Sequence, residues 1–340
     1  MLRPCVGYSL YRRKWLPALV EHMKVKVWIL ACLLVCLAQS GWARAGEMGR
    51  DVARADGSRI RYYLNMRDAS RHANQLLVVI QGSDCNSVTR VEAINRYAVR
   101  VMPAADVLTV EKFGIDAGLP YSDDLERADC PPAYLRHDSP AQRAADLDTV
   151  IAEVLRQHAY RQVVALGGSE GAVVAHLLAA RSDHVTATIA FNGGGQWFLD
   201  DVLHSIASSP IPAKEKTESK QGMRDFAHHI RTATPKAQAK ITASGHGYRW
   251  WRDSLDTDQL AVLQTSRSPT LIIQSGADES VSPAAVLAMV ARLHQAGKRN
   301  ITYKTYPALD HRFFGPDGQS RMADVVNDMA AWLQDVGIEP

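Results

Sequence analysis

A glycine-rich turn between two apolar segments constrains the fold of this chain more than any other feature. Residues 162–166 (QVVAL) form a short apolar run, and residues 170–180 are rich in alanine. The first pattern predicts a buried strand and the second a helix. Between them stands Gly167-Gly168-Ser169-Glu170-Gly171, and so sharp a turn from strand to helix leaves room only for glycine near its centre. The sequence therefore predicts that Ser169 lies on a strained bend at one edge of a sheet.

Strand-like and helix-like segments alternate along most of the chain. We expect strands at residues 59–64, 75–80, 106–110, 162–166, 185–191, 269–274 and 301–306, and helices at 87–101, 139–158, 170–180, 283–297 and 322–336. This alternation predicts an α/β fold with a mostly parallel central sheet and helices on both faces. The alternation stops at residues 196–268, a polar stretch that we interpret as a lid-like insertion across the carboxyl edge of the sheet. The alternative is a surface excursion without a role in substrate binding.

The first 45 residues have the pattern of a secretory leader. Lysines precede an apolar run at residues 27–38, and Ala43-Arg44-Ala45 follows, with small residues where a signal peptidase requires them. We predict a signal peptide over residues 1–45, with Met23 as a possible true start, and a mature domain over 46–340 that is periplasmic or secreted. The apolar run has about 12 residues, fewer than the roughly 20 that span a membrane, so we expect no stable membrane insertion after cleavage. An uncleaved anchor is the alternative.

Two cysteines remain after the predicted leader, and they agree with export. Cys85 and Cys130 are an even pair, and an oxidising compartment favours a disulfide between them. Such a bridge closes a loop of about 45 residues and contributes roughly 4 kcal/mol in the chain-entropy model. The alternative is a pair of unrelated buried thiols.

Charge and residue spacing argue against a nucleic-acid-binding protein and against a metalloprotein. The formal net charge is +3, and part of the excess lies in the leader, so no basic surface for nucleic acid is indicated. No spacing of cysteine and histidine indicates a metal site, and we expect no cofactor.

A serine needs a base to act as a nucleophile, and His311 is our choice among the 12 histidines. His311 follows the last predicted strand and so lies at the carboxyl edge of the sheet, where Ser169 is also expected. His176 and His294 fall within predicted helices, and His246, in the insertion, is the one rival.

Asp278 is the expected acid, because it follows the predicted strand at 269–274 and precedes His311 in the chain order serine, acid, histidine. Its neighbour Glu279 is the alternative. Asp310 is adjacent to His311, and we expect it to cap a turn instead.

An oxyanion hole requires two backbone amides. We expect one from Glu170, the residue after the nucleophile, and one from the loop after the strand at 75–80. In that loop Gly82 permits a close approach of the backbone, and Ser83 is the preferred donor, with Asp84 second.

The order of these elements, with the turn at Ser169 followed by Asp278 and His311, resembles the α/β-hydrolase superfamily, in particular its esterase and prolyl-oligopeptidase-like branch. The resemblance extends from about Gly57 to the end of the chain, and Gln81-Gly82 replaces the His-Gly that is common in lipases. It implies a covalent acyl-enzyme, no cofactor and a lid of variable shape.

The substrate is less strongly encoded. We expect a small-molecule carboxylic ester; the alternatives are a peptide, cleaved by a serine peptidase, or a non-catalytic binding protein on the same scaffold. Either an acyl pocket or the packing of the insertion accounts for its aromatic residues Trp197, Phe198, Tyr248, Trp250 and Trp251. Glu170 is either a partner for a substrate amine or a structural group.

Overall fold

The computed structural model describes residues 49–67, 73–124 and 126–339. The predicted signal peptide lies outside the described residues. Within the described ranges, no helix combines the length and the apolar character needed to cross a membrane.

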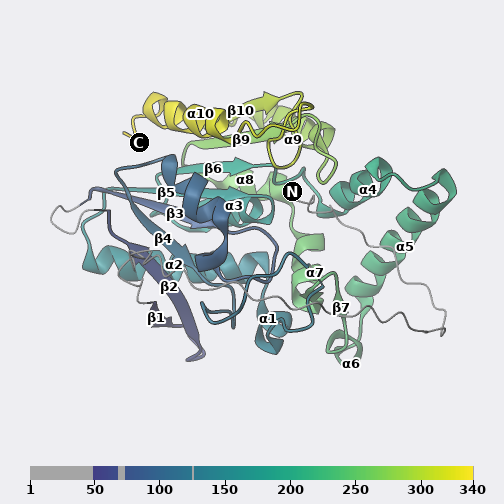
Figure 1. Cartoon of the computed structure of the whole chain (residues 1–340). Helices are drawn as coiled ribbons and strands as arrows, with labels where there is room; N and C mark the ends of the chain where they lie inside the picture. Colours follow the sequence, from purple (N-terminus) through teal and green to yellow (C-terminus); the bar gives the residue numbers. More distant parts are fainter. Residues whose placement is uncertain (1–48, 68–72, 125, 340) are drawn as a thin grey trace, which may run out of the picture.

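An eight-stranded sheet forms the centre of the molecule, in the spatial order β1-β2-β4-β3-β5-β6-β9-β10 (Figure 1). The strands are β1 (Arg50–Ala53), β2 (Arg59–Asn65), β3 (Gln75–Ile80), β4 (Asp106–Val110), β5 (Gln162–Gly168), β6 (Ala187–Phe191), β9 (Thr270–Ser275) and β10 (Ile301–Tyr306). β2 pairs antiparallel with β1 and β4, and all other pairs are parallel. The predicted α/β-hydrolase fold is therefore present. Its strand order reverses around β3 and β5, the place where ligands bind in open α/β sheets.

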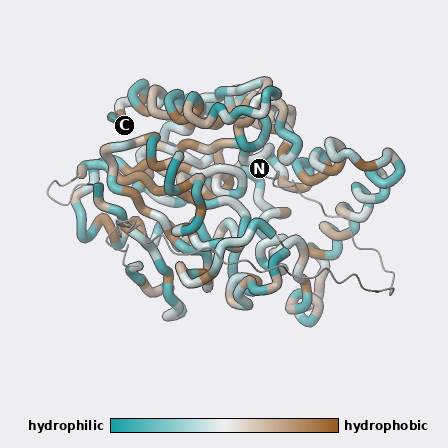
Figure 2. Tube along the Cα trace, viewed as in Figure 1, coloured by the Kyte–Doolittle hydropathy of each residue, from teal (hydrophilic) through white to brown (hydrophobic). Residues whose placement is uncertain are grey.

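Both faces of the sheet are covered, so its strands are apolar almost throughout, as the brown central strands of Figure 2 show. Leu76 and Val78 point to one face, where they pack under α2 (Pro140–Gln157) and α3 (Glu170–Arg181). Leu77 and Val79 point to the other face, which is covered by α10 (Met322–Asp335) and by the segment that follows β3. α9 (Pro283–Gln295) packs against β9 and β10.

The helix expected at residues 87–101 is the clearest difference from the predicted elements. The segment instead forms three short pieces: the 3₁₀ helix η1 (Val88–Arg90), the π-helix η2 (Ala93–Tyr97) and the 3₁₀ helix η3 (Ala98–Arg100). Ser87 caps η1, but its hydroxyl also bonds to the buried carboxylate of Glu111. This tertiary contact anchors the start of the segment, and packing under the sheet overrides the helical preference of its residues.

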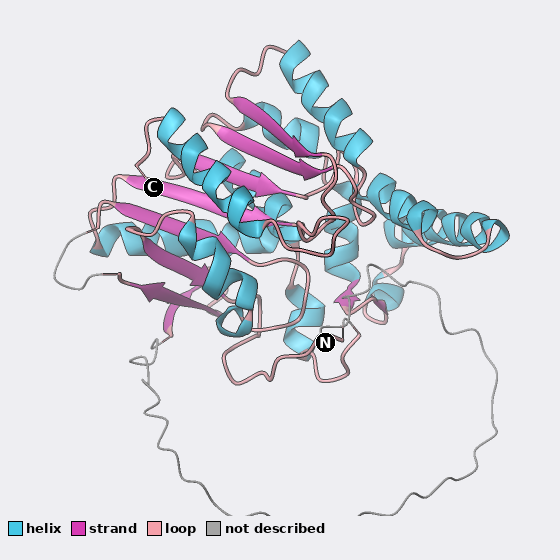
Figure 3. Ribbon diagram, turned by 45° about the horizontal axis from the view of Figure 1, so that its top comes forward, coloured by secondary structure: helices cyan, strands magenta, loops and turns pink. Residues whose placement is uncertain are grey.

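Between β6 and β9 the chain forms five helices, α4 (Phe198–Ser208), α5 (Ala213–Thr232), α6 (Pro235–Gln238), α7 (Tyr248–Asp256) and α8 (Gln259–Thr265), with a small hairpin of β7 (Thr242–Ala243) and β8 (His246–Gly247). α4 and α5 project from the body as an antiparallel pair (Figures 1 and 3). Together with α7 they enclose a separate apolar cluster, which we call the cap core. α8 lies outside this cluster, because Leu260 and Leu263 pack against α9 and the sheet.

Candidate active site

Ser169 lies on the sharp turn between β5 and α3. Its backbone has φ 55° and ψ −128°, a conformation that non-glycine residues rarely adopt. A hydrogen bond of 2.9 Å from the Ser169 amide to the carbonyl of Phe191 ties the turn to the end of the neighbouring strand β6. Such strain persists only where the surrounding structure enforces it, and it is frequent at functional sites.

The glycines around the turn are there for steric reasons. A Cβ at Gly167 would lie 2.1 Å from the carbonyl oxygen of Gly171, and one at Gly171 would lie 2.4 Å from the oxygen of Ile80. A Cβ at Gly168 would enter the ring of Phe191. These close approaches explain the pattern of glycines that predicted the turn.

The loop after β3 runs directly beside the turn. A Cβ at Gly82 would lie 3.8 Å from the Cβ of Ser169, so the two backbones are in near contact. Glu170 is the first residue of α3, and its amide therefore has no carbonyl of a preceding helical turn to bond. The Ser83 amide likewise has no acceptor among the described residues. The two amides expected to form an oxyanion hole are thus on adjoining segments, and both are free.

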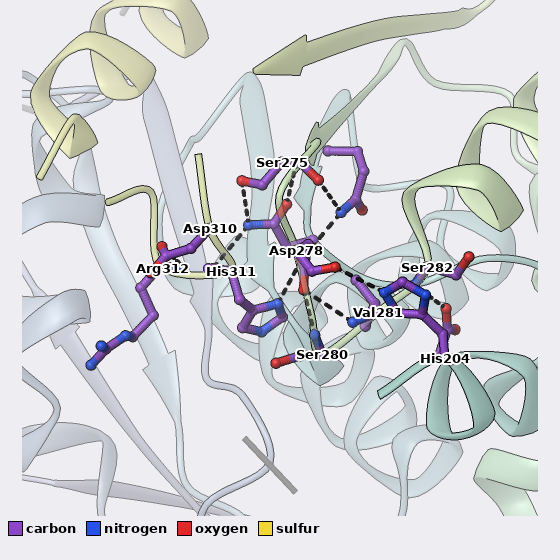
Figure 4. Close-up of polar contacts among 12 residues, drawn as sticks. His204, Ser275, Asp278, Ser280, Val281, Ser282, Asp310, His311 and Arg312 are labelled. Atoms are coloured by element: carbon purple, nitrogen blue, oxygen red, sulfur yellow. Dashed lines mark hydrogen bonds and ion pairs between the residues drawn. The ribbon is translucent and has the colours of Figure 1, made fainter. Parts of the chain in front are cut away.

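His311 and Asp278 are in direct contact. His311 Nδ1 lies 2.8 Å from Asp278 Oδ2, and Figure 4 shows the imidazole beside the carboxylate. Asp278 is fully buried, and its second oxygen accepts hydrogen bonds from the amides of Ser280 and Val281. With Nδ1 donating to the carboxylate, Nε2 is left to exchange a proton. Among the described residues, no hydrogen bond joins this imidazole to Ser169, a contact that is often long before substrate binds.

The rival side chains lie elsewhere. Glu279 is exposed, whereas Asp278 next to it is buried. Asp310 caps a turn, as expected, by accepting the amides of Arg312 and Phe314. His294, on α9, lies near the carbonyl of Ile301.

The remaining rival histidines are buried. His246 stacks on Trp250 with ring centres 3.8 Å apart and contacts the hydroxyl of Tyr134, while His176 lies beside Gln259. Burial lowers the pKa of His246 to about 3 and that of His176 to about 4, so both are neutral at pH 7.

Asn192, which the sequence analysis did not single out, holds the loop that carries His311. Its side chain donates to the carbonyl of His311 at 2.9 Å and accepts from the amide of Ser275 at 2.8 Å. Asn192 is buried and has a φ of 50°, the left-handed conformation that asparagine tolerates better than most residues. An asparagine directly after a predicted strand was the available signal, but its partner is 119 residues away in the sequence.

A cleft with an empty volume of about 630 Å³, including the part open to solvent, extends from Ser169 toward the cap core. One wall is formed by the sheet body, with Ser169, Glu170 and Val173, and the other by the helices α4 and α7. Phe198, Val202 and Trp250 are the apolar residues of this second wall. His311 is not among the residues that line the cleft.

The aromatic residues of the insertion therefore differ in whether they line the cleft or only pack within the cap core. Phe198 and Trp250 line the cleft and also pack in the cap core, whereas Trp251 is fully buried in that core. Trp197 is 37% exposed.

Two buried carboxylates border the cleft, and both are engaged within the protein. Glu170 binds Arg143 and the indole of Trp250. Burial alone would raise its pKa, but the charges of Arg143 and Lys112 outweigh burial and hold the pKa of Glu170 below its usual value. Asp201 accepts the amides of Gly195 and Ser282, and burial raises its pKa to about 7.

Cys85 and Cys130 form a disulfide, which lies beside the loop that contributes Ser83. Three buried basic side chains also donate to carbonyl groups of this loop: Arg143 to Gln81, Lys112 to Asp84, and Arg127 to Cys85. The loop is therefore held from several sides. In the described part of the chain, no group of three or more histidine, cysteine or acidic side chains is arranged to bind a metal ion.

Comparisons with solved structures show the same fold. The esterase Est1E from Butyrivibrio proteoclasticus, in its complex with ferulic acid, superposes with a TM-score of 0.54 at 14% identity, over 83% of this chain and 97% of that one. A puromycin-hydrolyzing peptidase from Mycobacterium tuberculosis gives 0.53 at 15% identity, over 85% of this chain and 39% of the peptidase. Dipeptidyl peptidase 4 from Porphyromonas gingivalis gives 0.51 at 14% identity, over 84% of this chain and 35% of the peptidase.

Sequence comparison identifies the family directly. No curated protein matches the chain at a significant level. A family profile, Hydrolase_4, described as serine aminopeptidase S33, matches residues 131–317, which is more than half of the chain and includes the turn at Ser169, Asp278 and His311. This chain is therefore a hydrolase of the α/β-hydrolase superfamily and belongs to the serine aminopeptidase S33 family.

Proposed function

We propose that this chain is a serine hydrolase that cleaves carboxylic esters of small molecules through an acyl-enzyme on Ser169. The observation that carries the proposal is the strained Ser169, which stands beside two free amides at the same sheet edge as the Asp278–His311 pair. A binding protein without catalytic function has no need for this combination.

The chemistry follows from these positions. His311 Nε2 takes the proton of Ser169 as Oγ attacks the ester carbonyl, and Asp278 stabilises the imidazolium that results. The amides of Ser83 and Glu170 bind the oxyanion of the tetrahedral intermediate. His311 then gives its proton to the departing alcohol, and a water molecule, activated in the same way, hydrolyses the acyl-enzyme and regenerates Ser169.

The cleft supports an apolar acyl group. It leads from Ser169 to Phe198, Val202 and Trp250, and its carboxylates are already occupied by internal donors. The acyl part of the ester therefore occupies the cleft, and His311 protonates the departing alcohol. Est1E, a protein of the same fold, has been solved with ferulic acid bound, which agrees with an apolar, aromatic acyl group.

A serine peptidase is the second candidate, because the matched family is described as serine aminopeptidase and peptidases share the fold. An aminopeptidase needs an acceptor for the substrate amine. Glu170 is poorly suited to this role, since Arg143 and Trp250 already bind its two oxygens. We therefore place the ester first.

Two measurements test this proposal. Aryl esters of short and aromatic acids and aminoacyl anilides are offered to the purified mature chain and to Ser169→Ala. Ester hydrolysis that is lost in Ser169→Ala supports the proposal. Preferential cleavage of the anilides would instead favour the peptidase function. Absence of hydrolysis in either series, together with absence of reaction with a fluorophosphonate, would leave the binding protein as the function.

We also propose that the chain is exported. The leader pattern at residues 1–45 and the disulfide Cys85–Cys130 support this, because such bridges persist in oxidising compartments. Fractionation of cells that express the full chain, followed by intact mass measurement, should give a processed protein that begins near Gly46 in the periplasm or medium. A cytoplasmic protein of full length would contradict export.

A further inference from the structure

The side chain of Arg143 binds both halves of the expected oxyanion hole. Arg143 lies in the first turn of α2, and its side chain is only 6% exposed. One nitrogen donates to Glu170 Oε1 at 2.5 Å, and the other donates to the carbonyl of Gln81 at 2.6 Å. A longer contact of 3.5 Å reaches the carbonyl of Gly82. A single guanidinium therefore binds both the residue after the nucleophile and the loop after β3.

One contact of Arg143 and one hydrogen bond within α3 set the directions of the two expected oxyanion amides. In a trans peptide the carbonyl and the amide of one unit point in opposite directions. The Gly82 carbonyl faces Arg143, so the Ser83 amide of the same peptide points away from Arg143. On the other side, the Ser169 carbonyl accepts the Ala172 amide at 3.0 Å, which directs the Glu170 amide away from α3.

The planar guanidinium is suited to hold such an arrangement. It presents donors in a rigid fork, whereas lysine offers a single charged point on a flexible stem. The burial of a charged pair is costly unless its hydrogen bonds are well made. A buried Arg143–Glu170 pair is therefore weak evidence for added stability, and its geometry indicates a role in fixing the distance between the two segments.

Trp250 extends the connection to the cap core. Its indole nitrogen donates to Glu170 Oε2 at 2.7 Å, while Arg143 occupies the other oxygen. Trp250 also packs edge-on against Phe198 of α4, and both rings line the cleft. The carboxylate that follows the nucleophile thus contacts the loop of the oxyanion hole through Arg143 and the cap core through Trp250.

We propose that Arg143 is a positioning residue that sets the spacing of the Ser83 and Glu170 amides for oxyanion binding, with Trp250 securing Glu170 from the cap core. The inference rests on the proposed function. Arg143 touches neither the substrate nor the reacting atoms and acts only through the two segments that it binds.

The test removes both members of the ion pair together, so that neither Arg143 nor Glu170 is left buried without the other. Arg143→Met combined with Glu170→Gln deletes both charges and keeps an acceptor for Trp250. Each amide of an oxyanion hole contributes about 10²–10³ in kcat, so a misplaced pair should lower kcat by about 10- to 100-fold. KM should change less than threefold. A trifluoromethyl ketone, which forms an oxyanion adduct with the serine, should lose affinity by the same factor as kcat/KM.

The matched control lies on the same helix. Asp146 of α2 forms a bidentate pair with Arg54, which follows β1; the side chains of Arg54 and Asp146 are 8% and 4% exposed, compared with 6% and 7% for Arg143 and Glu170. Arg54→Met with Asp146→Asn should therefore lower the melting temperature to a similar extent but leave kcat and ketone affinity within twofold. Arg143→Lys, which keeps the charge but loses the fork, should recover stability and only part of kcat.

The outcomes separate this inference from the proposed function. Loss of kcat and of ketone affinity in the Arg143 double variant, but not in the control, supports it. A double variant that matches the control in both measurements overturns it, and if the double variant does not fold, Arg143→Lys with wild-type kcat overturns it equally. If the wild type does not hydrolyse esters, or Ser169→Ala still does, the proposed function itself has failed.

Discussion

The sheet edge around Ser169 and the cap core differ in how their structure is determined. At the sheet edge, local sequence imposes the geometry, because glycines permit the turn and loops after strands bring Asp278 and His311 to the same edge. In the cap core, the contacts that reach the site are long-range. Trp250 binds Glu170 across 80 residues, and His204 of α4 lies 2.9 Å from the carbonyl of Asp278 across 74 residues (Figure 4). The groups proposed for the reaction therefore lie at the sheet edge, and the cap core reaches them only through tertiary contacts.

The largest expected effect is at the buried acid. Asp278→Asn should lower kcat by about 10⁴-fold, because an asparagine no longer favours the imidazole tautomer that accepts the serine proton. Glu279→Gln, a change of the exposed neighbour, should leave kcat within twofold. Steady-state ester hydrolysis measures both, and the reverse order of effects would transfer the role of the acid to Glu279.

The next effect contrasts a glycine of the turn with one of the insertion. Gly171→Ala places a Cβ 2.4 Å from the carbonyl of Ile80, where backbone must move, and should destabilise the chain by about 3 kcal/mol or prevent folding. Gly222→Ala, inside helix α5, should instead stabilise by about 0.5–1 kcal/mol. Urea unfolding measures both, and a tolerated alanine at residue 171 would contradict the steric account of the turn.

The buried, neutral His176 should make the stability of the chain depend on pH. The pKa of His176 falls to about 4 in the folded chain, because burial disfavours the charged form. The contribution of His176 to the free energy of unfolding is therefore complete above about pH 6.5. It is lost as the pH falls toward 4, and the total loss is on the order of 3 kcal/mol. The carboxyl of Asp201, whose pKa burial raises to about 7, contributes with the opposite sign.

The comparison of His176→Gln with the wild type isolates the histidine. As the pH is lowered from 7.5 to 5, the variant should lose less unfolding free energy than the wild type, since glutamine does not titrate and the contribution of Asp201 is the same in both proteins. Equal differences in the two proteins would show that the pKa of His176 is the same in the folded and unfolded chain.

The smallest effect concerns the connection between the two regions. Trp250→Phe keeps an aromatic wall but removes the hydrogen bond to Glu170, and kcat should fall by about threefold to tenfold. Trp251→Phe is the control, because the indole of Trp251 donates to the carbonyl of Ala243 within the insertion. A larger loss in the Trp251 variant would mean that packing of the cap core, and not the bond to Glu170, supports activity.

The sequence predicted the elements of the sheet body well because their signals are local. Strands β3 and β4 coincide with the expected ranges, and Ser139 and Ser282 cap α2 and α9 as their position before a proline predicts. The expected helix at residues 87–101 was wrong, because a contact from Ser87 to Glu111 and packing under the sheet broke it into three short pieces.

The roles of residues with partners distant in the sequence could not be predicted from local sequence patterns. Arg143 had the pattern of an ordinary residue in the first turn of a helix, and Asn192 that of a loop residue. Their partners at Glu170 and His311 are 27 and 119 residues away, and only the folded chain brings them together. The same reason applies to Trp250, whose two roles, lining the cleft and packing the cap core, could not be separated by composition.

Covalent labelling tests most directly whether Ser169 is the nucleophile. The folded mature chain is treated with a fluorophosphonate, digested, and analysed by mass spectrometry. We expect one phosphonylated residue, Ser169, with modification that parallels the loss of ester hydrolysis. A folded chain that stays unlabelled, or one that is inactivated by modification of another residue, would contradict this role of Ser169.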